Sequence, residues 1–267
     1  MINQVISALF TGWTLTLRSI RLEIREHVLG YAWTLITPML YAFCYIFIKR
    51  ELAGSAETHS TSAGWDALRA FSGITLVQCW MHVVQEMAAM VRSQKNMLKG
   101  LNVGPTPFVF AIIFESIFTV VIRSILIIVA VPLLGLPLPS TIEAWIWFLI
   151  SVAVIQLTAA AIGLLLAPWA TLYGDIAKAL SAINLPLVLI SPIFYPAVQR
   201  VDSPLYWINL VNPIASPLAV LADCLAGKPW SMYSLSLLAW GGLALTVIAW
   251  SIGKLQYQVP ILLERMG

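Results

Sequence analysis

Long apolar segments alternate with short polar segments along the chain, and this pattern predicts membrane-spanning helices. A helix needs about 20 mostly apolar residues to cross the hydrocarbon core of a bilayer. Five segments meet this requirement clearly: residues 30–48, 105–134, 144–173, 179–198 and 230–253. A sixth segment, residues 67–91, is more polar. The basic residues ahead of the first span and those that follow residue 91 can both lie in the cytoplasm only if this segment also spans. The pattern predicts an all-α integral membrane protein with six transmembrane helices.

Residues 204–226 are apolar but contain Pro213, Pro217 and Asp223. A lipid-exposed helix through these prolines would leave backbone polar groups without partners in hydrocarbon. We therefore expect a re-entrant or interfacial pair of short helices at the outer side, before the last span.

Residues 10–28, ahead of the first span, show the pattern of an amphipathic helix. Apolar side chains recur at spacings of three and four, at Trp13, Leu17, Ile20, Ile24 and Val28. Three arginines repeat with the same period on another face: Arg18, Arg21 and Arg25. We expect this helix to lie in the cytoplasmic interface with its arginines near lipid phosphates or a partner. A solvated helical face would show the same pattern.

The distribution of Lys and Arg predicts the orientation, since positive charge is retained on the cytoplasmic side of a membrane. With the N-terminus inside, the cytoplasmic segments carry Arg18, Arg21, Arg25, Arg92, Lys95, Lys99, Lys178, Lys254 and Arg265. The outer segments carry Lys49, Arg50, Arg69, Arg200 and Lys228. Both termini are therefore expected in the cytoplasm.

The composition agrees with a single membrane domain over residues 1–267. Apolar residues make up 60% of the chain and charged residues only 10%, against about 45–50% and about 25% in an ordinary soluble domain. A water-soluble globule is excluded. The net charge of +3 is small and scattered, so a nucleic-acid partner, which requires clustered basic residues, is excluded as well.

Ionisable and aromatic side chains inside the predicted spans are candidates for a substrate path. Glu115 and Arg123 lie in the span at residues 105–134. Ionisable groups inside a span are costly and are retained either as structural anchors or for transport. The first span carries Trp33, Tyr41 and Tyr45, whose rings could stack on sugars or serve ordinary packing. We take these five residues as the candidate path.

Two further segments are candidates for moving parts. The prolines that frame residues 192–196, together with the Asn-Pro pair at residues 212–213, suggest an outer gate, although they could equally kink a helix for packing. The candidate gate residues are Pro192, Phe194, Tyr195, Pro196, Asn212 and Pro213.

The basic loop after residue 91 suggests a docking surface for a motor protein, although a topological loop would carry the same charge. Its candidate coupling residues are Arg92, Lys95, Asn96, Met97, Leu98 and Lys99.

The sequence offers no cluster of catalytic residues. The three histidines, His27, His59 and His82, form no ligand pair at helical spacing, so we expect no metal site. The chain lacks the Gly-x-x-x-x-Gly-Lys-Ser/Thr loop that cradles ATP phosphates. We expect no catalytic residue and no cofactor on this chain, and any ATPase would be another polypeptide.

Four short motifs follow one another along the predicted spans. Residues 25–38 contain a basic residue, then Leu-Gly-Tyr-Ala-Trp, then Pro38. Asn-Met-Leu-Lys at residues 96–99 precedes Pro105, residues 191–196 read Ser-Pro-Ile-Phe-Tyr-Pro, and residues 209–213 read Asn-Leu-Val-Asn-Pro. Together these motifs resemble the permease subunits of ABC-2 type exporters, in the branch that moves O-antigen, capsular or teichoic polysaccharide.

The resemblance implies a homodimer in the bacterial inner membrane, with a path for a lipid-linked polysaccharide at the dimer interface. It also implies two cytoplasmic ATPase subunits, which bind ATP and Mg²⁺. The chain departs from the family where Gly174-Asp175-Ile176 lacks a preceding arginine and where Asp223 replaces a basic residue. Three alternatives remain: an ABC-2 exporter of a drug or small lipid, an intramembrane enzyme acting on lipid-linked sugars, and a proton-driven carrier using Glu86 and Glu115.

Overall fold

The computed structural model describes residues 2–26, 32–33, 36–37, 39–40, 43–44, 47, 61–100, 104–198, 200–228, 230 and 232–265. Within these residues it contains helices and no strand, which confirms the predicted all-α class. The helices are α1 (Ile2–Glu26), α3 (Thr61–Ser93), α4 (Lys95–Gly100), α5 (Thr106–Leu133), α6 (Ile142–Leu172), α7 (Asp175–Ile190), α8 (Pro204–Val211), α9 (Ala215–Leu225) and α10 (Ser234–Arg265).

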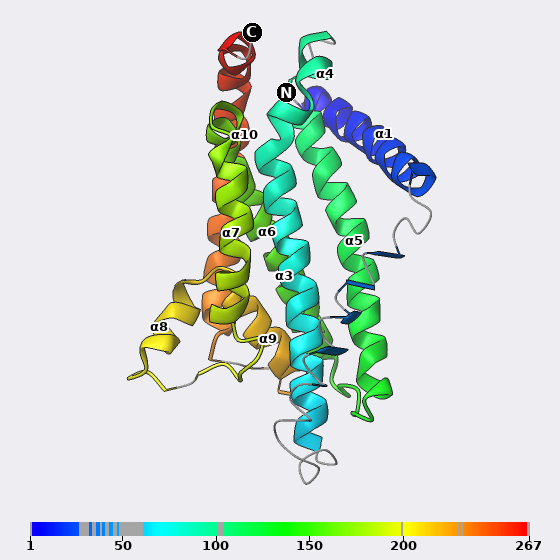
Figure 1. Cartoon of the computed structure of the whole chain (residues 1–267), viewed down its shortest axis with the longest axis vertical. Coiled ribbons are helices and arrows are strands. Elements are labelled where there is room, and N and C mark those ends of the chain that lie inside the picture. The colour runs from blue at the N-terminus through cyan, green and yellow to red at the C-terminus, as the bar shows by residue number, and fades with distance from the viewer. Residues whose placement is uncertain are drawn as a thin grey trace.

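Four of the described helices are long and apolar enough to cross a membrane: α3 from Gly64 onward, α5, α6 and α10. They run along the long axis of the molecule, and the start of α1 and the end of α10 lie at the same end (Figure 1). Helices α8 and α9 form a pair bent by 100°, which would count as a fifth crossing if the pair spans. The predicted first span at residues 30–48 lies largely outside the described residues, so the count of six stays a prediction.

Helix α7 corrects the predicted span at residues 179–198. The helix begins earlier, at Asp175, and ends at Ile190, and Ser191 is already extended with φ −74° and ψ 152°. The cause is Pro192, because a proline disfavours the helical conformation of the residue before it. The 16 residues of α7 rise about 24 Å, less than the hydrocarbon core of about 30 Å. Residues 191–196 therefore form a turn beyond the helix.

The predicted last span at residues 230–253 also needs correction. Helix α10 starts at Ser234 and continues through Pro260 to Arg265, over 32 residues. Its length of about 48 Å exceeds the hydrocarbon core. The C-terminal part of α10 therefore extends beyond a single membrane crossing.

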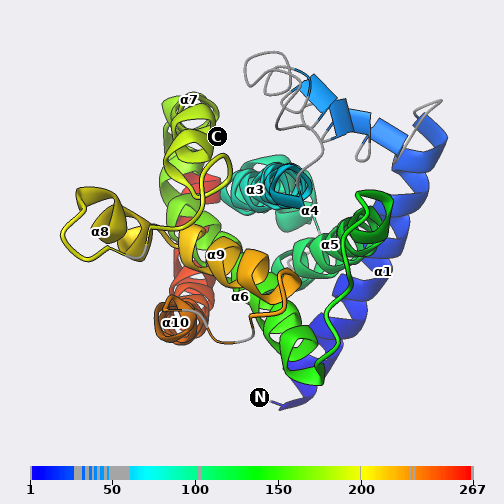
Figure 2. The ribbon, with the colours of Figure 1, turned by 90° about the horizontal axis from the view of Figure 1, so that it is seen from below.

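The centre of the bundle is the contact between α3 and α6, with α5 and α10 on its flanks (Figure 2). A Cβ added at Gly163 would lie 2.5 Å from the Cβ of Met87 and 2.8 Å from the carbonyl oxygen of Val84. The absent side chain therefore lets the two helix backbones approach closely. Trp80 Nε1 donates a hydrogen bond to Thr158 Oγ1 across the same contact, at 3.1 Å.

Helix α1 crosses the upper part of α5 obliquely (Figure 1). The contact uses small residues at a spacing of four, namely Ala8, Gly12 and Thr16, which are buried. Thr16 Oγ1 donates to the carbonyl oxygen of Ala111 at 3.0 Å. The apolar face predicted for residues 10–28 contributes Trp13, whose ring centre lies 5.7 Å from that of Phe114 of α5 in an edge-to-face arrangement. Trp13 and Leu17 are nevertheless exposed, and Ile20 is half-buried, so much of this face is available to lipid.

Candidate functional site

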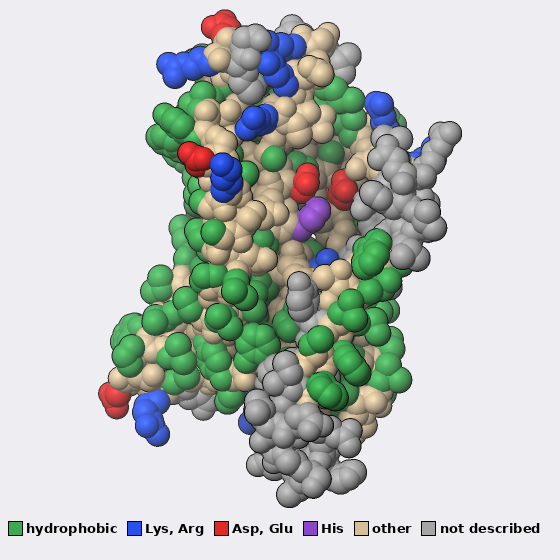
Figure 3. Space-filling view, viewed as in Figure 1, with side chains coloured by type: hydrophobic (Ala, Val, Ile, Leu, Met, Phe, Trp, Pro, Cys, Tyr) green, Lys and Arg blue, Asp and Glu red, His purple; other side chains and the backbone are tan. Residues whose placement is uncertain are grey.

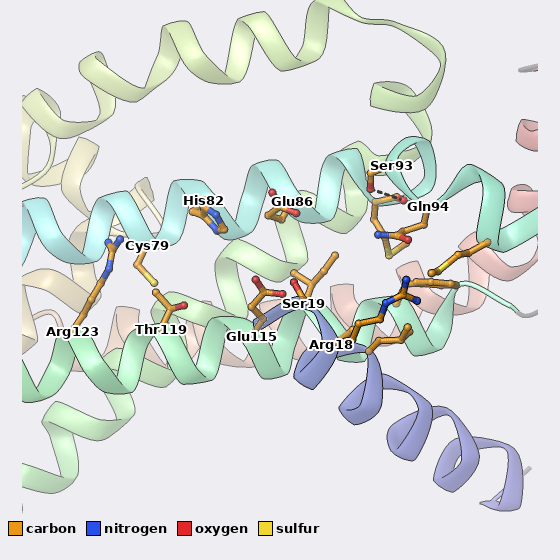
Figure 4. A pocket seen from close by; sticks show the side chains of 16 residues that line it. Arg18, Ser19, Cys79, His82, Glu86, Ser93, Gln94, Glu115, Thr119 and Arg123 are labelled. Carbon is orange, nitrogen blue, oxygen red and sulfur yellow. Dashed lines mark hydrogen bonds between the residues drawn. The ribbon is translucent and has the colours of Figure 1, made fainter. Parts of the chain in front are cut away.

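A polar cavity of about 480 Å³ opens between α1, α3, α4 and α5, and we call it the inner groove. Acidic and histidine side chains gather in the corresponding hollow of the molecular surface (Figure 3). Its polar and charged lining residues are Arg18, Ser19, Cys79, His82, Glu86, Ser93, Gln94, Glu115, Thr119 and Arg123 (Figure 4). The inner groove concentrates ionisable groups within helices that are long enough to span.

One wall of the inner groove is a single face of α3. His82, Glu86 and Ser93 follow one another at spacings of four and seven, which places them on the same side of a helix. All three are exposed, whereas the neighbouring Val84 and Met87 are fully buried. Of the polar positions in this predicted span, His82 and Glu86 therefore share the groove, whereas Arg69, Gln78 and Gln85 do not line it.

The opposite wall is a face of α5. Glu115, Thr119 and Arg123 occur at intervals of four residues and line the groove together. Figure 4 shows the carboxyl groups of Glu86 and Glu115 facing each other across the groove. The structure thus brings Glu115 and Arg123, the two predicted path residues of this span, into one cavity. They do not bond each other directly, because they are eight residues apart on one helix.

Arg123 closes the deep end of the inner groove. Its side chain is buried, and its NH1 atom donates a hydrogen bond of 2.6 Å to the carbonyl oxygen of Thr75 in α3. Gln156 of α6 lies beside it and donates through Nε2 to the carbonyl oxygen of Ser116 and to Cys79 Sγ, both at 3.3 Å. These bonds connect α3, α5 and α6. Sequence reasoning missed Gln156, although a buried amide in an apolar span is a signal that could have found it.

Helix α4 forms the mouth of the inner groove. Met97 lines the groove, and Leu98 is buried against the core. Arg92, Asn96 and Lys99 are exposed, and Lys95 is half-buried. The predicted coupling residues therefore divide into an inward pair, which holds α4 on the bundle, and an outward set that is accessible to a partner.

The remaining predicted inner residues do not extend this site. Arg18 lines the groove mouth and Arg21 is exposed, while the side chain of Arg25 lies outside the described residues. Trp33 is exposed and is not among the lining residues of the groove. Tyr41 and Tyr45 lie outside the described residues, so the proposed aromatic path remains a prediction.

At the other end of the bundle, hydrogen bonds join residues 191–196 to α8, α9 and the start of α10, and we call this region the outer cap. Asn212 Nδ2 donates to Ser191 Oγ at 3.0 Å, and Asn212 Oδ1 accepts from the backbone N–H of Ile214 at 3.2 Å. Asn212 thus connects the turn after α7 to the bend at Pro213 between α8 and α9.

Tyr195 makes the next connection in the outer cap. Its hydroxyl donates to the carbonyl oxygen of Ile190 and lies 3.4 Å from Asn209 Oδ1. Burial raises the pKa of Tyr195, an effect that the hydrogen bond to Asn209 partly opposes. The hydroxyl therefore keeps its proton at neutral pH and remains a donor.

The outer cap also contacts α10 and α3. Trp240 Nε1 of α10 donates to the carbonyl oxygen of Leu210 at 3.1 Å. The side chain of Ile193 is fully buried and lies 2.8 Å from the position that a Cβ at Gly73 would take. All six predicted gate residues therefore lie in one region, which comprises residues 191–196 and the bend at Pro213.

A second cavity, of about 450 Å³, lies between the outer cap and the outer end of α3. Pro192 and Pro196 line it together with Asp223, and Asp66 and Arg69 form an ion pair of 2.8 Å on its α3 side. The two framing prolines of the predicted gate therefore line this cavity together with Asp223, at which the chain departs from the family pattern.

Comparison with known proteins places this arrangement in context. The family model described as ABC-2 type transporter matches residues 12–225. This match covers more than half of the 267-residue chain and extends from within α1 to the end of α9. It includes the inner groove, α4 and most of the outer cap. No curated protein sequence matches the chain.

Proposed function

The chain belongs to the ABC-2 type transporter family, and we propose that it is the permease of an exporter that moves a lipid-linked polysaccharide across the bacterial inner membrane. As an ABC-2 membrane domain it is a transport subunit that depends on a partner ATPase. In this proposal two copies of the chain enclose the path, and ATP and Mg²⁺ bind to the partner. The termini and the mouth of the inner groove face the cytoplasm.

The observation that carries the proposal is the charge inside the inner groove. Glu86, Glu115 and Arg123 line one cavity between helices that are long enough to span. Ionisable groups at such positions are expensive unless they face water or a polar ligand. A hydroxyl-rich cargo and its accompanying water would solvate the exposed carboxylate of Glu86, whereas a purely apolar cargo would desolvate it at a cost in free energy.

The shape of the inner groove supports a cargo that keeps a lipid anchor. Among the described residues, the hollow opens on the side of the bundle, between α3 and α5 (Figure 3). A lateral opening lets a polar head group enter the protein while its hydrocarbon chain stays in the bilayer. This is the geometry that a glycan attached to a lipid requires.

The position of α4 supports coupling to the ATPase. Its exposed Asn96 and Lys99 provide contacts for a docked partner, and its Met97 lines the inner groove. Because Leu98 is buried, α4 moves only together with the helices on which it packs. In the proposed cycle, closure of the ATPase pushes α4, narrows the groove and opens the outer cap.

A second candidate cargo is a drug-sized molecule or a small lipid. The volume of the inner groove, about 480 Å³, lies within the range of about 300–1,000 Å³ that is usual for small-molecule pockets. A polysaccharide would have to pass through in sections, a few sugars at a time.

The test is reconstitution of the chain with its co-purifying ATPase in vesicles. One set of vesicles contains a lipid-linked glycan and the other a fluorescent amphipathic dye. We expect ATP-dependent exposure of the glycan to an added glycosidase, and no ATP-dependent loss of dye. Glu86→Gln should reduce glycan export at least tenfold, while Glu264→Gln, at an exposed position near the end of α10, should leave it unchanged.

Three outcomes would contradict parts of this proposal. Export of the dye with an immobile glycan would overturn the polysaccharide assignment in favour of the second candidate. Chemical turnover of the lipid-linked glycan by the chain without ATPase would indicate an intramembrane enzyme. Normal export by Asn96→Asp with Lys99→Asp, which alters only exposed residues of α4, would overturn the docking surface.

A further inference from the structure

A third cavity lies in the groove between α6 and the C-terminal half of α10, and its volume is about 590 Å³. Figure 2 shows α10 on the side of the bundle away from α1, so this cavity is separate from the inner groove. It shares no lining residue with the inner groove. We call it the α6–α10 cavity.

The α10 wall of the cavity carries two cations on one face. Lys254 and Arg265 are separated by eleven residues, which is about three helical turns, so both side chains leave α10 in nearly the same direction. Both are exposed and line the cavity. Among the described residues that line it there is no carboxylate. The cavity is therefore complementary to an anion.

Two buried polar atoms of α10 also lack partners in this cavity. Ser251 is 4% exposed, and its Oγ has no hydrogen-bond partner among the described residues. The same holds for Gln258 Oε1, one helical turn beyond Lys254. Buried polar groups are nearly always satisfied in folded proteins. A ligand with both acceptors and donors, such as a phosphate ester with a free hydroxyl or amine, would satisfy these two side chains once they turn toward the cavity.

The α6 wall of the cavity is apolar, and its position matches a membrane interface. Leu164, Leu165 and Leu172 line it. Trp169 of α6 and Trp250 of α10 are exposed at its edges, and Lys254 Nζ lies 4.6 Å from the centre of the Trp250 ring. Tryptophan is enriched where lipid head groups meet the hydrocarbon core, and lysine extends toward that level. The leucines provide a surface for an acyl chain below it.

We propose that the α6–α10 cavity binds an anionic phospholipid of the leaflet on the α4 side of the membrane. Lys254 binds its phosphate, while Arg265, about 16 Å farther along α10, attracts the anion through its charge. Ser251 and Gln258 contact the polar head group, and the α6 leucines contact an acyl chain. Basic pockets between transmembrane helices are known to bind anionic lipid head groups. This assignment concerns a structural lipid and is independent of the cargo of the exporter.

The test counts the lipids that the full-length chain retains. The protein is purified in detergent with added phosphatidylglycerol or phosphatidylcholine and analysed by native mass spectrometry. We expect one phosphatidylglycerol per chain to be retained in preference to phosphatidylcholine. Lys254→Gln with Arg265→Gln should weaken this retention about tenfold or more, because each basic contact contributes to the affinity. Lys99→Gln with Lys178→Gln removes the same charge from exposed positions outside the cavity and should retain the lipid.

A second variant tests the shape of the cavity without changing its charge. Leu165→Trp would fill the apolar side of the cavity while both cations remain, and it should lose the lipid as well. Equal retention by the cavity variants and the control variant would overturn the proposal. Displacement of the bound species by inorganic phosphate would do the same, since it would indicate a site for free phosphate. The proposal would also be overturned if the partner ATPase, and not a lipid, occupied the cavity.

Discussion

The two faces of α3 differ sharply in their surroundings. One face packs against α6, where Val84 and Met87 are fully buried and Gly163 permits backbone contact. The other face carries His82 and Glu86, which are exposed in the inner groove. The same helix is therefore a fixed wall on one side and a polar lining on the other. Its position relative to α6 is set by this packing, so a change in groove width requires α3 and α6 to move together relative to α1 and α5.

The largest effect is expected from a substitution at Gly163, where α6 packs on α3. A Cβ at this position would lie 2.5 Å from Met87 Cβ and 2.8 Å from the Val84 carbonyl oxygen, and backbone cannot yield as a flexible side chain does. Gly163→Ala should lower the free energy of unfolding by about 2–3 kcal/mol. The measurement is thermal unfolding of the purified chain in detergent.

Gly242→Ala is the matched control, because a Cβ there would have no neighbour within 4 Å. It should be neutral or slightly stabilising, since alanine favours helix more than glycine does. If Gly163→Ala unfolds at the same temperature as Gly242→Ala, the close packing of α3 on α6 is contradicted.

The second largest effect is expected at Arg123, where the groove face and the packed core meet. Arg123→Met removes the 2.6 Å hydrogen bond to the Thr75 carbonyl oxygen that connects α5 to α3. Hydrogen bonds to charged groups contribute about 1.5–3 kcal/mol, so we expect a loss in this range by thermal unfolding, together with lost export. Arg200→Met, at an exposed position outside the groove, is the control. A stable but inactive Arg123→Met protein would indicate that Arg123 serves the path and not the packing.

A third, smaller effect is expected in the outer cap, where the turn after α7 packs on α3. Asn212 holds the turn that places Ile193 on Gly73, through its bonds to Ser191 Oγ and the Ile214 N–H. Asn212→Ala should cost about 1 kcal/mol of stability and should increase hydrogen exchange in residues 191–196. Asn96→Ala, which changes an exposed amide on α4, should alter neither property. Unchanged exchange in the outer cap would show that Asn212 does not hold it closed.

The sequence predicted the helices better than it predicted which helices contact one another. The long apolar runs of α5 and α6 gave boundaries within two residues, because burial in hydrocarbon requires length and apolarity that few other segments have. The rule against helix before proline could have ended α7 at residue 190. The long apolar character of residues 179–198 outweighed it in the prediction.

The sequence pointed to individual residues of the candidate site, but not to the helix packing that brings them together. Glu115 and Arg123 stood out as ionisable groups in an apolar run. Their union with His82 and Glu86 depends on which helices are adjacent, and helix periodicity does not specify this. Contacts through small residues were also missed. A Cβ at Gly12 or at Gly163 would lie within 3 Å of an atom of a neighbouring helix, but small residues are common throughout apolar segments and carry no local signal of a partner.

The smallest effect on stability, and the sharpest contrast between the faces, is expected at Glu86. Its side chain is exposed in the inner groove, so Glu86→Gln keeps the shape and should change the free energy of unfolding by less than about 0.5 kcal/mol. Export by the reconstituted complex should nevertheless fall, because the groove loses a charge that attracts water and polar cargo. Gln85→Glu, at the adjacent half-buried position outside the groove lining, adds a carboxylate one helical step away and should not restore export in the double variant. Unfolding temperature and export rate measured on the same preparation decide the point. If Glu86→Gln lowers both in proportion, the groove face contributes to folding as the packed face does, and the distinction between the two faces of α3 fails.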